Sequence, residues 1–199
     1  MQIRTGVGAV IVVSLAITAT VGIVHADDPI ASLNRAIQDR FKDVDDTFGL
    51  RRIVVIGDTP HRFRPETVTE LAAVREVEDA QLRVAMYVAG RRVLDREPDL
   101  TTKMPFAVNR RVIFGPIAVT PPISADGLPQ ATDLIEESRI AFLKLAERDR
   151  HDFELTDWKF TARAIRASTT KCLTCHRGSS VGDPLGVVLY AYRPREQLK

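Results

Sequence analysis

The apolar residues in the first part of the chain follow two different periods, which predict two kinds of element. Between residues 29 and 48 they recur every three or four positions, as in an amphipathic helix, and Asp28 is suited to begin that helix. A β-branched run over 50–56 predicts a short strand, and a second helix is expected after Pro65. The apolar face of this second helix is expected to consist of Val68, Leu71, Val74 and Val77.

Alternation typical of strands dominates the middle of the chain. Apolar residues alternate over 82–88, and two more follow at 93–94 after a glycine, which predicts a β-hairpin. A loop is expected over 96–109 and another strand over 112–119. Pro116 lies within that strand and has no backbone N–H to donate, so the strand is expected at a sheet edge or at a bulge.

The last part of the chain combines one helix with two strands. The helix is predicted over 133–149, where Asp133 and Glu136 have the spacing of a capping box. Alternating apolar residues then predict strands over 158–167 and 185–192, on either side of the two cysteines. The sequence therefore predicts an α+β fold, in which helices are interleaved with antiparallel strands.

The first 26 residues differ from the rest and resemble a secretory signal peptide. Arg4 precedes an apolar stretch, and Val24 and Ala26 suit a signal peptidase at the positions before the cut. The stretch of about 19 residues is close to the roughly 20 that span a bilayer, so an uncleaved anchor stays open as the alternative. Either way, residues 27–199 are expected to form one domain outside the cytoplasm, in the periplasm of a bacterium.

Composition excludes several classes of protein. The chain has 199 residues, of which 45% are hydrophobic and 27% charged, so it can bury a core as one globular domain. Its net charge of +2 is too small to indicate a nucleic-acid partner or a polybasic membrane surface. Its two cysteines exclude a scaffold held by several disulfides.

Both cysteines belong to one C-x-x-C-H motif, Cys172-Leu173-Thr174-Cys175-His176. Two thiols at this spacing can bond to the two vinyl groups of one porphyrin, and the histidine that follows can bind its iron. The motif therefore predicts one covalent haem c, attached through Cys172 and Cys175, with His176 as the proximal iron ligand. Haem is attached in this way outside the cytoplasm of bacteria, in agreement with the export signal.

Three other uses of the cysteines fit less well. A structural zinc site needs about four ligands, and the other histidines after residue 26, His61 and His151, are not at finger spacing. A thioredoxin-type pair follows a strand early in the chain, whereas this pair lies late in the sequence, at 172 and 175 of 199 residues. A disulfide across two intervening residues is strained and closes a loop too small to stabilise much.

The surroundings of the motif resemble a known family. Three segments carry the resemblance, the stretch 158–168, the Cys-Leu-Thr-Cys-His sequence and the turn Gly182-Asp183-Pro184-Leu185-Gly186. Together they look like the end of the bacterial single-haem c-type domains with a PAS-like fold, over about residues 131–195. The resemblance implies a PAS-like antiparallel sheet with flanking helices, and a redox or ligand sensor. A sensor of this kind would need a separate signalling protein as its partner.

Further residues are candidates to contact the haem. Arg163, Arg166 and Arg177 are close to the motif in sequence and suited to pair with the haem propionates, although solvated surface arginines are the ordinary alternative. His61 is the preferred sixth iron ligand because arginines beside it offer propionate partners, with a vacant position as the alternative. The other donors considered for this position are His151, Met86 and Met104.

These features predict an exported monohaem c-type cytochrome that acts in electron transfer or haem-based redox sensing, with a redox or signalling protein as its partner. The alternatives are a gas-binding haem module and a small haem enzyme, which both need an open sixth iron position. The sequence offers no catalytic triad, phosphate loop or pair of carboxylates, so no catalytic residues are predicted. Contact with a membrane is expected only if the N-terminal segment is retained.

Overall fold

The computed structural model describes residues 28–42, 61–94, 113–120 and 127–195. The predicted signal peptide, the strand expected over 50–56 and the loop expected over 96–109 lie outside these residues. The described residues form a six-stranded, mostly antiparallel sheet together with four α-helices. The predicted α+β fold is therefore confirmed. None of the described helices is long and apolar enough to cross a membrane.

The elements follow one another along the chain in an order that mixes helices and strands. The α-helices are α1 (Pro29–Lys42), α2 (Val68–Asp79), α3 (Ile135–Lys144) and α4 (Cys172–Cys175). The strands are β1 (His61–Arg62), β2 (Leu82–Gly90), β3 (Ile113–Ala118), β4 (His151–Leu155), β5 (Trp158–Arg166) and β6 (Pro184–Pro194). Two 3₁₀ turns are η2 (Arg91–Leu94) and η4 (Ala131–Leu134).

The first and last long strands pair at the centre of the sheet. The strand order is β1-β3-β2-β6-β5-β4, with β1 parallel to β3 and all other neighbours antiparallel. The pairing of β2 with β6 runs without a break from Leu82↔Pro194 to Gly90↔Gly186. The hairpin predicted from 82 to 94 is therefore wrong, because β6 pairs along the whole of β2 whereas residues 93–94 belong to η2.

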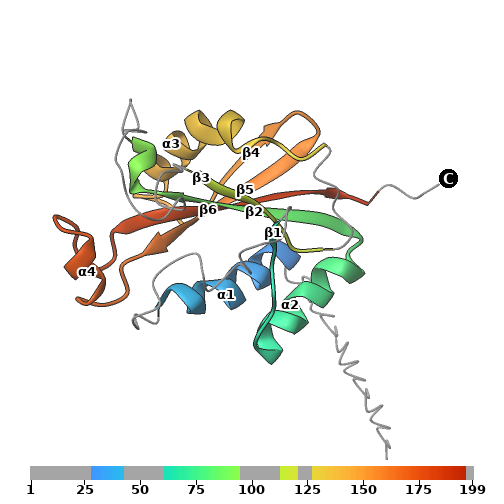
Figure 1. Cartoon of the computed structure of the whole chain (residues 1–199), viewed down its shortest axis with the longest axis horizontal. Helices are drawn as coiled ribbons and strands as arrows, with labels where there is room; N and C mark the ends of the chain where they lie inside the picture. The colour runs from blue at the N-terminus through green and yellow to red at the C-terminus, as the bar shows by residue number, and fades with distance from the viewer. Residues whose placement is uncertain (1–27, 43–60, 95–112, 121–126, 196–199) are drawn as a thin grey trace, which may run out of the picture.

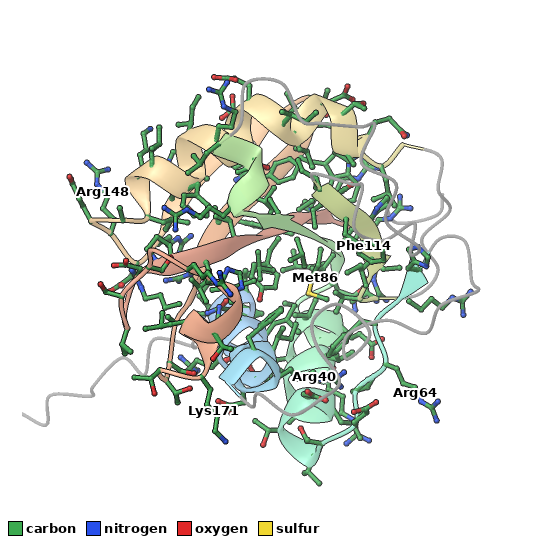
Figure 2. All side chains as sticks on the ribbon, turned by 60° about the vertical axis from the view of Figure 1, so that its left-hand side comes forward. Arg40, Arg64, Met86, Phe114, Arg148 and Lys171 are labelled. Atoms are coloured by element: carbon green, nitrogen blue, oxygen red, sulfur yellow. The ribbon has the colours of Figure 1, made fainter. Side chains whose placement is uncertain are left out.

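Helices cover both faces of the sheet. Helices α1 and α2 lie on one face and α3 on the other, while α4 projects beyond the ends of β5 and β6 (Figure 1). The core on the α3 side contains Trp158, Phe160 and Ala162 of β5 and the alternate residues Val187, Leu189 and Ala191 of β6. These are the inward faces that the two-residue period predicts for both strands. The core on the other side includes Met86, labelled in Figure 2.

Two predicted elements differ from the structure at their ends. The helix expected over 133–149 begins as η4 and continues as α3, so Asp133 falls inside a 3₁₀ turn and no side chain caps either element. The predicted capping box is therefore wrong. The strand expected over 112–119 is β3, beside the two-residue β1, and its pairing with β2 shifts register between Met86 and Val88. That irregularity agrees with the bulge expected from Pro116.

The helix predicted after Pro65 is α2, but its predicted apolar face is only half right. Val74 and Val77 are buried, whereas Val68 is 86% exposed and Leu71 41% exposed. Glu70 takes the inward position instead, at 2% exposed. It caps the helix by accepting from the backbone N–H of Thr67, while Thr67 Oγ1 accepts from the N–H of Glu70. The charged side chain of Glu70 can be buried here because a residue of another helix pairs with it.

Arg40 of α1 is the partner that holds Glu70. Its Nε donates to one carboxylate oxygen of Glu70, and its Nη2 donates to the other at 2.5 Å and to the carbonyl of Arg64 at 2.7 Å. Figure 2 shows Arg40 between the two helices. Burial raises the pKa of Glu70, but the hydrogen bonds from Arg40 and the backbone outweigh that effect and hold the pKa below its usual value.

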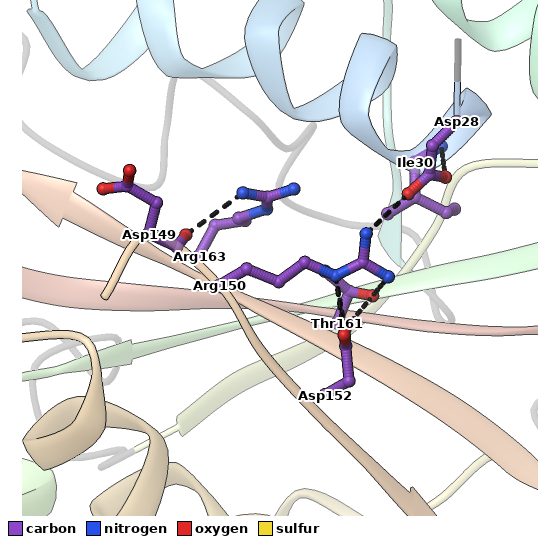
Figure 3. A network of polar contacts seen from close by, with 7 residues as sticks. All are labelled: Asp28, Ile30, Asp149, Arg150, Asp152, Thr161 and Arg163. Atoms are coloured by element: carbon purple, nitrogen blue, oxygen red, sulfur yellow. Dashed lines mark hydrogen bonds and ion pairs between the residues drawn. The ribbon is translucent and has the colours of Figure 1, made fainter. Parts of the chain in front are cut away.

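A second polar network fixes the other end of α1 (Figure 3). Asp28 accepts from the backbone N–H of Ile30 at 3.0 Å and forms an ion pair with Arg150 at 2.9 Å. Arg150 also contacts Asp152 of β4 at 2.7 Å, and Asp152 accepts from the buried hydroxyl of Thr161 on β5 at 2.8 Å. The start of α1 is thereby tied to the edge of the sheet.

Replacing Glu70 by Gln is expected to destabilise the protein by about 3 kcal/mol at pH 7, because Arg40 loses its buried charged partner and keeps only the exposed Glu66, at 3.9 Å, among the ion pairs of the described residues. Since the pKa of Glu70 is lowered in the folded state, its contribution is present at neutral pH and is lost as the pH falls below about 4.3. Denaturant unfolding followed by circular dichroism should show wild type and Glu70→Gln converging in acid. The control is Glu66→Gln, whose side chain is 66% exposed and which should change stability by less than about 0.5 kcal/mol. A constant difference across pH would contradict the assignment.

Candidate haem-attachment site

The C-x-x-C-H motif lies on a loop that leaves the end of β5 and returns at β6. Helix α4 is a single turn, closed by the backbone N–H of His176 donating to the carbonyl of Cys172 at 3.2 Å. In a helical turn, positions three and four residues apart lie on the same side. Positions 172, 175 and 176 have this spacing in the sequence, and it is the spacing that attachment of a single porphyrin requires.

The base of this loop is closed by backbone hydrogen bonds. The N–H of Gly182 donates to the carbonyl of Ala167, and the N–H of Ala167 donates to the carbonyl of Asp183, both at 2.9 Å. Gly182 has φ +95°, a conformation that residues with a Cβ rarely adopt. The side chain of Asp183 accepts from the N–H of Ser180 at 2.7 Å. The Gly-Asp pair thus brings the chain back to the sheet.

Gly186, the second glycine of that turn, is required for a different reason, the close approach of a neighbouring strand. A Cβ at Gly186 would lie 2.9 Å from the carbonyl oxygen of Ala89 on β2, so only glycine fits between β2 and β5 at this position. The presence of Gly182, Asp183 and Gly186 in this turn is therefore explained by backbone conformation, a hydrogen bond and close strand packing, respectively. The turn positions the motif loop at the end of the three central strands.

Cys172 is buried at the inner side of the loop. Its side chain is 5% exposed and packs with Ala167, Leu173 and Leu185. The hydroxyl oxygens of Ser168 and Thr169 each lie 3.8 Å from Sγ. Burial raises the pKa of the Cys172 thiol, but the hydrogen bonds from these two residues outweigh burial, and the pKa lies below its usual value. This environment favours the thiolate, which is the nucleophilic form of cysteine.

His176 follows the turn and is partly buried. Burial lowers the pKa of its imidazole, and the positive charge of Arg91 lowers it further. A lowered pKa favours the neutral ring, which has a nitrogen lone pair available for a metal ion. The carbonyl of His176 accepts from the N–H of Ser179 at 3.3 Å, and this contact holds the backbone after the motif.

The three predicted propionate partners have different surroundings. Arg166 donates to the carbonyls of Leu145, Arg148 and Gly182 at 2.8 to 3.2 Å, so its guanidinium group ties the loop to the end of α3. Arg163 donates to the carbonyl of Asp149 at 3.1 Å, as Figure 3 shows. Arg177 is exposed on the motif loop itself. Pairing with propionates stays a prediction for all three.

Sequence reasoning missed Arg91, which lies 85 residues before His176. It begins η2 directly after β2, and its Nη1 donates to Ser179 Oγ at 2.6 Å. The pairing of β2 with β6 brings this arginine to the motif loop. No local pattern could have indicated the contact, because it depends on the pairing of strands that are remote in sequence.

The structure does not bring the preferred sixth ligand, His61, to the motif. His61 pairs with Ile117, which lies opposite Met86, four residues along β2 from the end of the sheet at Gly90. At the usual spacings in a sheet this separates His61 from that end by roughly 16 Å. Its ring stacks on Phe114 at 4.9 Å, and its Nδ1 is buried without a partner among the described residues.

The other donors considered for the sixth position are also occupied elsewhere or lie outside the described chain. Met86 is fully buried in the core on the α1 side. His151 begins β4 opposite Ala162, and its ring stacks on Phe153 at 5.8 Å. Met104 lies outside the described residues. Within the part of the chain that the structure describes, no three His, Cys, Asp or Glu residues form a metal-binding group.

Comparison with known proteins assigns neither a family nor a function to this chain. No family model, curated protein or solved structure matches this chain. The function is therefore inferred from the motif and from the residues around it.

Arg166→Gln is expected to loosen the motif loop, because three backbone carbonyls lose a charged donor. A loss of roughly 1 to 2 kcal/mol of local stability corresponds to about 5- to 30-fold faster opening of the loop. Limited trypsin digestion, with cleavage after the exposed Lys171 and Arg177, would measure that change. Arg62→Gln, at an exposed position on β1, serves as the matched control and should digest like wild type. Equal rates for both variants would show that Arg166 does not hold the loop.

Proposed function

We propose that the protein is an exported monohaem c-type cytochrome, with thioether bonds to Cys172 and Cys175 and His176 as the proximal iron ligand. The observation that carries the proposal is the C-x-x-C-H motif on a single helical turn, where positions 172, 175 and 176 have the spacing of one helix face. Two features of the chain's own residues support it. The pKa of Cys172 is lowered, which favours the thiolate needed for attachment, and the pKa of His176 is lowered, which favours a neutral ligand.

The sheet supports the PAS-like part of the proposal. Apart from the two-residue β1, the strands run in the order β3-β2-β6-β5-β4. The first and last of these five strands in sequence are thus paired at the centre, which is the arrangement of a PAS-like sheet. Helices on both faces agree with the flanking helices that the family resemblance implies (Figure 1).

Electron transfer or haem-based redox sensing is the proposed activity. The bound haem would supply one-electron chemistry, and the chain would supply attachment, a proximal ligand and a polar environment. A redox protein, or a separate signalling protein for a sensor, is the proposed partner in the periplasm. Contact of the protein with a membrane is proposed only if the N-terminal segment is retained.

One observation favours the alternative of a gas-binding module or a small haem enzyme. Of the side chains considered for the sixth position, the three in the described part of the chain are stacked or buried away from the motif loop. An iron with no sixth protein ligand is open to carbon monoxide, oxygen or nitric oxide. The state of that position distinguishes an electron carrier from a ligand-binding protein.

Covalent attachment is tested by extraction of the purified exported protein with acidified acetone. Haem is expected to stay on the polypeptide, because thioether bonds survive the extraction. Cys172→Ala and Cys175→Ala should each leave at most one thioether, seen as a shifted pyridine haemochrome band. Ser179→Ala is a control on the same loop that retains both cysteines and should give the wild-type band. Complete release of haem from the wild-type protein would refute the proposal.

The sixth position is tested by optical spectra of the reduced protein with and without carbon monoxide. If His61 binds the iron, His61→Ala should create carbon monoxide binding and change the low-spin spectrum. The stacking of His61 on Phe114, away from the end of the sheet, leads us to expect no such change. His151→Ala is the matched control. Carbon monoxide binding by the wild-type protein would identify an open site and favour the alternative function.

A further inference from the structure

A cleft of about 520 Å³ lies between the later turns of α1 and the end of β5. Its lining includes Asn34, Gln38 and Phe41 from α1, Ala164 from β5 and Ser168 from the segment after β5. Cavities of this size hold small organic ligands and cofactors in other proteins. The cleft is distinct from the cysteine turn, and no motif in the sequence indicates it.

The cleft opens next to the predicted attachment point. Ser168 lines it, and the hydroxyl oxygen of the same residue is 3.8 Å from Cys172 Sγ. Figures 1 and 2 both show α4 beside the end of α1, at the same end of the sheet. A group bonded to Cys172 is therefore adjacent to the cleft.

Polar side chains in the cleft are held in one orientation by hydrogen bonds. Gln38 Nε2 donates to the carbonyl of Ala164 at 3.0 Å and to Asn34 Oδ1 at 3.3 Å. The fully buried Tyr190 donates its hydroxyl to the same Asn34 oxygen at 3.1 Å. A carbonyl can only accept, so the Gln38 atom must be its nitrogen, and the Asn34 atom facing that nitrogen must be its oxygen.

We propose that this cleft holds the porphyrin of the haem attached at Cys172. The inference rests on the proposed function and extends it, because it names the surface that the haem contacts. Phe41 and Ala164 provide apolar contact for the ring, and the fixed amide of Asn34 provides a donor. Arg35 and Asp39 also line the cleft and are exposed. The Arg35 guanidinium, which donates to Ser32 Oγ at 3.1 Å, brings a positive charge suited to pair with a propionate. Helix α1 thus becomes part of the haem environment.

A matched pair of glutamine variants tests the cleft in the haem-loaded protein. Gln38→Glu introduces a negative charge there, which stabilises ferric haem, and it should lower the reduction potential. Gln81→Glu is the same chemical change at the other end of the sheet, next to Leu82↔Pro194. Gln81 also donates to a backbone carbonyl, that of Glu78 at 3.2 Å, so both variants lose a comparable bond. The control should keep the wild-type potential.

Arg35→Gln gives a second test that leaves the bonds among Gln38, Asn34 and Tyr190 in place and removes the donor to Ser32 Oγ. Loss of its positive charge should also lower the potential, whereas Arg75→Gln, at an exposed position of α2, should not. If Gln38→Glu fails to fold, the comparison of Arg35→Gln with Arg75→Gln alone tests the proposal. Unchanged potentials in the cleft variants, with haem still covalently bound, would refute the proposal that the cleft holds the porphyrin. The proposed function would stay intact in that case. Wild-type protein without covalent haem would overturn the proposed function itself.

Discussion

The free edge of β5 is the constraint on which the arrangement around the haem motif depends. Strand β4 pairs with β5 only as far as His151↔Ala162, and no other described strand pairs with the rest of β5 on that side. Backbone groups at such an edge need other partners, and Gln38 of α1 donates to the carbonyl of Ala164 there. At the end of the strand the side chain of Arg166 donates to the carbonyls of Leu145, Arg148 and Gly182, which lie outside β5. The last part of β5 therefore contacts α1 and also anchors the start of the motif loop.

The two ends of α1 are held with different strength. At its start, the Asp28–Arg150 pair is 38% exposed on both sides, and exposed pairs of this kind contribute less than about 1 kcal/mol. Near its end, Arg40 is 9% exposed and Glu70 2% exposed, and a buried pair is costly to break. The end of α1 that approaches the motif is thus the more firmly held.

The sequence predicts the parts of the fold that depend on local periodicity. Strands β5 and β6 bury the faces that alternation indicates, because those residues of the two neighbouring strands lie on the same face of the sheet and belong to one core. The errors arise where a remote partner decides. Glu70 is buried because Arg40 reaches it from another helix. Strand β2 pairs with β3 and with β6, which lies about a hundred residues later, and not with residues 93–94. Neither Arg40 nor β6 can be found from the spacing of nearby residues.

The same distinction separates the two halves of the candidate site. The attachment motif is readable from the sequence because both thiols and the imidazole lie within five consecutive residues. The cleft is not, since Gln38 and Ala164 are 126 residues apart and meet only after the sheet has formed. A motif of this kind can attach haem, whereas the surroundings of the haem set its potential. On the proposal that the cleft holds the haem, those surroundings would include α1, a helix that no haem signature would have identified.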